Sequence, residues 1–158
     1  MELQRRSEMA QLLRALRGHA PDGLRTVAVV GGVEYIDDSR STFLDASLCA
    51  ILDLGKPLVW IIDGSMAKAL DRRMLEFMRE HVDGTVFFGP ADAAAVDALD
   101  AAIGRVYAAG DLRTAVFAAR ELACLGAKVL FSPACPSGNG TANHAERAVE
   151  FKRAVLDL

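Results

Sequence analysis

The chain has 158 residues, 52% of them hydrophobic and 6% aromatic, with a formal net charge of −3. This length fits one domain with a sizeable core, and the composition argues against extended disorder. A slightly acidic chain creates no global positive field for nucleic acid, and no apolar run is long enough to span a membrane, so neither partner is expected.

The N-terminal part of the sequence alternates between helical and β-branched stretches. Apolar residues at helical spacing predict a helix over residues 2–17. The runs TVAVV (26–30) and VEYI (33–36) flank two glycines, which predicts a hairpin or a closely linked strand pair. A helix over 45–54 and a buried strand, LVWII (58–62), are predicted next.

The remaining sequence continues this alternation. The further predictions, in chain order, are a helix over 66–81, a strand over 85–89, a helix over 91–99, a short strand over 105–108, a helix over 111–125, a strand over 127–135 and a helix over 143–157. Strands that alternate with helices predict an α/β fold: a doubly wound, mostly parallel sheet with helices on both faces.

Three polar loops follow three of the predicted strands. They are DDSRST (37–42, the first loop), DGSMAK (63–68, the second loop) and SPACPSGNGTANH (132–144, the third loop). Ligands of doubly wound sheets bind beyond the carboxyl ends of the strands. We therefore expect the three loops to meet at one edge of the sheet and to form a ligand site there.

The first loop holds more polar residues than a turn requires. Asp38 is a candidate for orienting a cation, Arg40 for holding a phosphate or carboxylate, and Thr42 for donating a hydroxyl bond at a helix N-terminus. The alternative is that Ser41 or Thr42 only caps the following helix and the acids solvate a loop.

The second and third loops offer donors for an anion. A lysine in the first turn of a helix, as predicted for Lys68, opposes the helix dipole, so it indicates either an anionic ligand or a solvated side chain. The third loop offers neutral hydrogen bonds from Ser132, Ser137, Asn139, Thr141 and Asn143. His144 is interpreted as a helix-start residue. Arg147 is a candidate carboxylate ligand, or else the partner of a surface ion pair with Glu146 or Glu150.

Several kinds of chemistry have no motif in this sequence. No nucleophile triad, zinc-ligand spacing, GxxxxGK[ST] phosphate loop or GxGxxG fingerprint occurs, so neither a catalytic residue nor a metal site is expected on this chain alone. The cysteines Cys49, Cys124 and Cys135 show no CxxC spacing and are interpreted as buried thiols in a reducing cytoplasm.

In combination, three motifs point to a known family. They are GVEYIDDSRST, the glycine-and-lysine turn after a buried strand, and VLFSPACPS followed by N, R and F. Together they resemble the C-terminal domain of the Mur ligase family, most closely its members that add D-glutamate in peptidoglycan synthesis. The resemblance covers residues 24–158 and implies a Rossmann-like fold for 21–158. Residues 1–20 would then be a helix left from the family's central domain.

The resemblance also implies roles for individual residues. Asp38, Arg40 and Thr42 would occupy the motif that touches nucleotide. D-glutamate or a similar acidic amino acid would be bound by Thr42, Lys68, Ser137, Asn143 and Arg147. ATP and Mg²⁺ are expected only with the N-terminal and central ligase domains, supplied in cis or in trans, and the chain alone is expected to be an inactive part of an ATP-dependent ligase.

Departures from the family pattern favour an alternative. The usual lysine of the first loop is Arg40 and its usual asparagine is Phe43, while the family's His-Arg pair aligns with Asp22 and Gly23. Arginine and lysine are not equivalent at a tight phosphate contact. The alternative is therefore a stand-alone, non-catalytic descendant that binds a ligand or a protein. A third possibility is a doubly wound domain with an unrelated small-molecule site.

Overall fold

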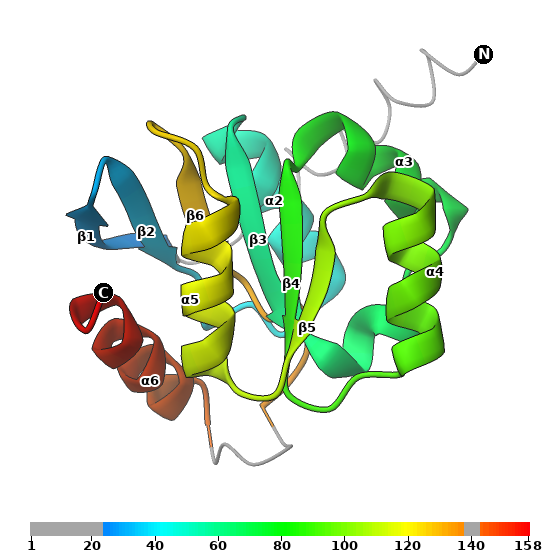
Figure 1. Cartoon of the computed structure of the whole chain (residues 1–158). Helices are drawn as coiled ribbons and strands as arrows, with labels where there is room; N and C mark the ends of the chain where they lie inside the picture. The colour runs from blue at the N-terminus through cyan, green and yellow to red at the C-terminus, as the bar shows by residue number, and fades with distance from the viewer. Residues whose placement is uncertain (1–23, 138–142) are drawn as a thin grey trace.

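Six strands form one sheet in the order β1-β2-β6-β3-β4-β5 in the computed structural model, which describes residues 24–137 and 143–158 (Figure 1). The β1–β2 pair is antiparallel and every other neighbouring pair is parallel. The strands are β1 (Arg25–Val30), β2 (Val33–Asp37), β3 (Leu58–Asp63), β4 (Gly84–Phe88), β5 (Val106–Ala109) and β6 (Lys128–Phe131). The predicted α/β class and mostly parallel sheet are confirmed. The helix predicted over 2–17 lies outside the described residues.

Helices cover both faces of this sheet. They are α2 (Leu44–Leu54), the 3₁₀ helix η1 (Gly64–Ala69), α3 (Arg72–His81), α4 (Ala93–Ile103), α5 (Leu112–Leu122) and α6 (His144–Leu156). In Figure 1, α5 and α6 lie in front of the sheet and α2 lies behind it. This is the doubly wound arrangement that the alternation of elements predicts. No helix among the described residues has the length and apolar character needed to cross a bilayer.

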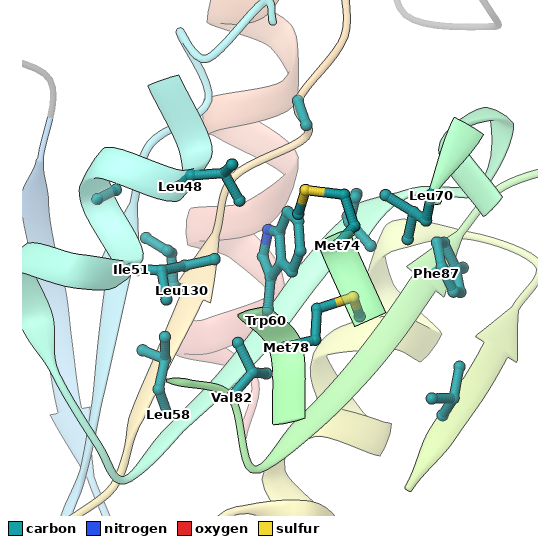
Figure 2. Close-up of a cluster of buried hydrophobic side chains, with 14 of the residues drawn as sticks. Leu48, Ile51, Leu58, Trp60, Leu70, Met74, Met78, Val82, Phe87 and Leu130 are labelled. Atoms are coloured by element: carbon teal, nitrogen blue, oxygen red, sulfur yellow. The ribbon is translucent and has the colours of Figure 1, made fainter. Parts of the chain in front are cut away.

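The alternation of side chains along β3 explains the two layers. Trp60 and Ile62 point into a cluster with residues of α2, α3 and α4, whereas Val59 and Ile61 point into a second cluster with α5 and α6. Figure 2 shows Trp60 in the first cluster, with Leu48 of α2 on one side and Met74 of α3 on the other. Both faces of a central strand are thus buried, which is why LVWII is apolar throughout.

The β1–β2 hairpin places a two-residue turn at Gly31 and Gly32. Their φ angles are +58° and +77°, a left-handed conformation that glycine adopts without the steric penalty of a Cβ. The hairpin prediction is confirmed.

Several predicted elements have different bounds: the helix predicted over 91–99 is α4 and ends at Ile103, and the helix predicted over 111–125 is α5 and ends at Leu122. The helix predicted over 66–81 is broken, because Asp71 accepts a hydrogen bond from the Met74 backbone N–H at 3.1 Å and starts α3 anew after η1. The strand predicted over 127–135 ends at Phe131, since Pro133 has no N–H for a sheet hydrogen bond.

Candidate functional site

The first, second and third loops leave the sheet at one edge, which we call the carboxyl edge. In the parallel register, Asp37 at the end of β2 is paired with Phe131 at the end of β6. Backbone bonds continue past the strands: the N–H of Asp38 donates to the carbonyl of Phe131 at 2.8 Å, and that of Asp63 donates to the carbonyl of Pro133 at 3.2 Å. The expected convergence of the three loops is confirmed.

A buried chain of hydroxyl groups joins the first loop, α2 and the third loop. The Ser132 hydroxyl donates to Oδ2 of Asp38 at 2.7 Å. Its oxygen lies 2.5 Å from Oγ of Ser47 in α2, which in turn lies 2.6 Å from Oγ of Ser41. All four side chains are buried. We call this set, Asp38, Ser41, Ser47 and Ser132, the hydroxyl chain.

Asp38 is the only acid of the hydroxyl chain, and its ionisation sets the direction of the bonds. Burial raises the pKa of Asp38 to about 6, the Ser132 hydrogen bond opposes that rise, and the charge of Asp37 adds to it. At neutral pH the ionised carboxylate only accepts. Ser132 must therefore donate to Asp38, Ser47 to Ser132, and Ser41 to Ser47, because each hydroxyl has one proton. This network fixes the shape of the first loop.

Arg147 of α6 is buried, with 1% of its surface exposed. One terminal nitrogen, Nη2, donates to the carbonyl of Ser39 at 2.9 Å, and the other, Nη1, donates to the carbonyl of Cys135 at 3.1 Å. The alternative that Arg147 makes only a surface ion pair is therefore wrong. Its guanidinium connects the backbones of the first and third loops from below the surface.

The other candidate residues lie nearer to solvent. Arg40 and Thr42 are exposed, and Ser137 is half-buried. Asn143 caps α6 by accepting from the Glu146 backbone N–H at 3.0 Å. The Asn143 side chain is exposed, which leaves its amide N–H groups directed to solvent or ligand.

Lys68 occupies a position different from the one expected. It lies in the last turn of η1, not the first turn of an α-helix, so the helix-dipole argument for an anion does not apply. Its Nζ lies 3.2 Å from Oδ2 of Asp92, which caps α4, and 71% of the lysine side chain is exposed. Lys68 is thus held near the start of α4 while it keeps access to solvent.

The helix after the first loop has no side-chain cap. Its N-cap position is Phe43, with extended backbone and no cap hydrogen bond from the side chain. The alternative that Ser41 or Thr42 serves as the cap is wrong. Ser41 turns inward to Ser47, and Thr42 stays exposed one residue before the cap position.

Close backbone packing holds the second loop against the loop after β4. A Cβ placed on Gly64 would lie 2.5 Å from the carbonyl oxygen of Pro90 and 2.8 Å from that of Gly89. Only glycine permits this approach. The second loop also meets the third, because Oγ of Ser65 lies 3.7 Å from Sγ of Cys135. The interpretation of the cysteines as buried thiols holds for Cys49 but is wrong for Cys124, which is exposed, and for Cys135, which is half-buried.

Sequence reasoning missed Ser47 and Gly64 as site-building residues, and it named Ser132 only as a neutral hydrogen-bonding residue of the third loop. Ser47 interrupts the apolar pattern of α2, and Ser132 directly follows the apolar strand VLF. In both places the sequence indicated only weakly that the hydroxyl is buried and hydrogen-bonded. Gly64 had none beyond its place in a turn.

Comparisons with known proteins show which proteins this chain is similar to. No protein-family model matches the chain. The chain is 35% identical over 150 residues to the UDP-N-acetylmuramoylalanine--D-glutamate ligase of Bordetella parapertussis, an alignment that covers 93% of this chain and 29% of that ligase. It is 38% identical over 139 residues to the ligase of the same name from Myxococcus xanthus, covering 87% of this chain and 30% of the relative.

A third such ligase, from Rubrobacter xylanophilus, is 41% identical over 146 residues, covering 88% of this chain and 32% of the ligase. The chain therefore spans less than a third of the length of these relatives. The resemblance drawn from the motifs is confirmed: these ligases are similar to the chain over 87–93% of its length. Its relatives are the D-glutamate ligases, and the coverage agrees with a match to their C-terminal domain.

Proposed function

We propose that the chain is the amino-acid-binding C-terminal domain of a Mur-type ligase of peptidoglycan precursor synthesis in the cytoplasm. Its ligand would be D-glutamate or a similar acidic amino acid. The convergence of three donor-rich loops at the carboxyl edge supports this proposal, together with the homology to D-glutamate ligases. An anion at this edge needs cationic and hydroxyl donors, and both kinds are accessible there.

The proposed contacts follow from exposure. Lys68 supplies a cation for the side-chain carboxylate, and Thr42 and Ser137 supply hydroxyl donors. Asn143 adds an amide group at the start of α6. Arg147, buried on two backbone carbonyls, supports the ligand site from beneath.

The proposed nucleotide contacts come from the exposed part of the first loop. Arg40 and Thr42 would touch nucleotide directly, while Asp38 would act by shaping the loop. The described residues hold no group of three or more His, Cys, Asp or Glu side chains placed to bind a metal ion. We therefore assign Mg²⁺ and the phosphate-binding loop to the central ligase domain, so the chain alone would be inactive.

Calorimetric titration of the chain with D-glutamate tests the substrate, with L-glutamate as the stereochemical control. Binding of the D-enantiomer is expected, and Arg40→Ala should leave this binding intact while weakening nucleotide binding in the assembled ligase.

Adding the N-terminal and central domains of a relative should restore ATP-dependent ligation. Ligation that stays absent from every such mixture, with a folded chain, would refute the ligase assignment.

Phe43 favours a second candidate, a non-catalytic module that binds a ligand or a protein. This aromatic side chain is 57% exposed beside Thr42, where the family pattern has a polar residue. Exposed aromatic residues are enriched in protein interfaces. Failure of reconstitution combined with retained D-glutamate binding would favour this candidate.

A further inference from the structure

Arg147 connects two loops that leave neighbouring strands. Ser39, which accepts from Nη2, follows β2, and Cys135, which accepts from Nη1, follows β6. Arg147 itself belongs to the first turn of α6. One planar side chain therefore relates three segments, and the distance between its two terminal nitrogens limits how far the two carbonyls can separate.

A buried arginine whose terminal nitrogens donate to two backbone carbonyls is an unusual structural contact. Burying a cation is unfavourable, and burial lowers the pKa of Arg147, while the charges of Cys135, Asp63 and Asp37 oppose that fall. The acceptors of its two terminal nitrogens, the backbone carbonyls of Ser39 and Cys135, are neutral. Nε is also buried, and it has no hydrogen-bond partner among the described residues. Within residues 24–137 and 143–158, no carboxylate is hydrogen-bonded to this buried cation; its acceptors are backbone carbonyls.

The apolar contacts between α6 and the sheet come from residues other than Arg147. The same helix contributes Phe151, Ala154 and Val155 to the apolar cluster with α5 and the sheet. Phe151 stacks on Phe131 of β6, with ring centroids 5.0 Å apart. These contacts hold α6 on the sheet. The hydrogen bonds of the Arg147 guanidinium go instead to the backbone of the first and third loops.

We propose that Arg147 is a positioning residue: its guanidinium holds the first and third loops at the spacing in which their donors face one acidic ligand. This inference rests on the proposed function only for the identity of that ligand. The bridge between the loops stands on the contacts of the ligand-free chain. Arg147 tightens binding through the loops and through its charge, without touching the ligand.

Two variants separate the forked geometry from the charge. Arg147→Lys keeps a cation but loses the planar pair of nitrogens, and Arg147→Met loses both. Arg153→Lys is the matched control, because Arg153 is an exposed arginine of the same helix. Amide hydrogen exchange of the ligand-free chain reports the loops, since the Ser39 N–H is bonded to Asp37 and the Ser41 N–H to the Asp38 carbonyl.

We expect the Ser39 and Ser41 amides to exchange at least tenfold faster in Arg147→Lys than in the wild type, while amides of the central strand β3 keep their rates. The D-glutamate dissociation constant should rise at least tenfold in Arg147→Lys and further in Arg147→Met. Arg153→Lys should stay within twofold in both measurements.

The two proposals fail in different ways. Unchanged loop exchange in Arg147→Lys, or equal acceleration in loops and β3, would overturn the positioning role whether or not D-glutamate binds. Accelerated loop exchange in a chain whose wild type binds no D-glutamate would support the bridge and refute the proposed ligand.

Discussion

The hydroxyl of Ser132 donates to the carboxylate of Asp38 across 2.7 Å, although the two residues are 94 positions apart in the chain. Ser132 also holds Trp60 through its backbone, since the indole Nε1–H donates to its carbonyl at 2.8 Å. One residue therefore couples the first loop to the apolar core. The shape of the candidate site thus depends on the packing of the sheet as well as on the loop sequences.

Replacing Asp38 with asparagine should change how stability depends on pH. The pKa of Asp38 is about 6 in the folded chain, above its ordinary value of 3.8, so the folded state binds the proton more tightly. The free energy of unfolding contributed by Asp38 is thus highest below pH 4 and is lost as pH rises through 6, by roughly 3 kcal/mol in total. Asp38→Asn should remove this loss, and urea unfolding across that pH range measures it.

Asp111→Asn provides a control of opposite sign. The pKa of Asp111 is lowered, mainly by the Thr114 backbone hydrogen bond, so its ionised form favours the folded state above its unfolded pKa. That contribution is lost as pH falls through the folded pKa of Asp111.

If the free energy of unfolding depends on pH in the same way in Asp38→Asn and in the wild type, the carboxyl of Asp38 is not desolvated.

Gly64→Ala should destabilise the chain by about 2 kcal/mol, because the added Cβ would overlap the Pro90 and Gly89 carbonyl oxygens and backbone must move. Gly110→Ala is the control: its Cβ would meet nothing within 4 Å, so a change below about 0.5 kcal/mol is expected. Thermal unfolding compares the two. Equal effects of both substitutions would show that the second loop is not held by close backbone packing.

The sheet, the hairpin and the meeting of three loops could be predicted because they follow from local pattern and from the geometry of parallel strands. LVWII is apolar on both faces, and paired glycines follow TVAVV, so each element had a signal within a few residues. The rule that parallel strands end at one edge then placed the loops without any knowledge of side-chain contacts.

The internal bonds of the site could not be predicted in this way. Ser47 and Ser132 are 85 positions apart, and serine occurs both inside and on the surface of proteins. Arg147 lies in the first turn of an amphipathic helix, where a charged residue normally faces water. Its burial depends on two carbonyls supplied by loops that the helix meets only in the folded chain.

Phe43→Asn should stabilise the chain by about 1 kcal/mol, because asparagine can accept a hydrogen bond from the exposed N–H groups of the first turn of α2. Phe43 has the extended backbone of an N-cap residue but gives no such bond. Urea unfolding of Phe43→Asn and of Phe43→Ala separates the cap from the loss of the ring. A gain shared by both variants would mean that removal of the exposed ring, not capping, is responsible.

Tyr35→Phe should also stabilise the chain, by about 1 kcal/mol. Tyr35 is fully buried, and its hydroxyl has no hydrogen-bond partner among the described residues. Removing an unsatisfied buried hydroxyl recovers its desolvation cost while keeping the ring in place. Tyr107→Phe, at a half-exposed tyrosine of β5, should have little effect on the melting temperature. Loss of stability in Tyr35→Phe would show that this hydroxyl is bonded in solution.

Lys68→Met should separate ligand binding from folding. Lys68 is mostly exposed, and its ion pair with Asp92 is screened by water, so the melting temperature should not change measurably. Under the proposed function, the D-glutamate dissociation constant should rise at least tenfold, as measured by calorimetry. Lys56→Met is the matched control, since Lys56 also forms an exposed ion pair, with Asp83 at 3.5 Å, but precedes β3 at the opposite edge of the sheet. Equal affinity losses in both variants would mean that general charge, not the carboxyl-edge site, attracts the acid.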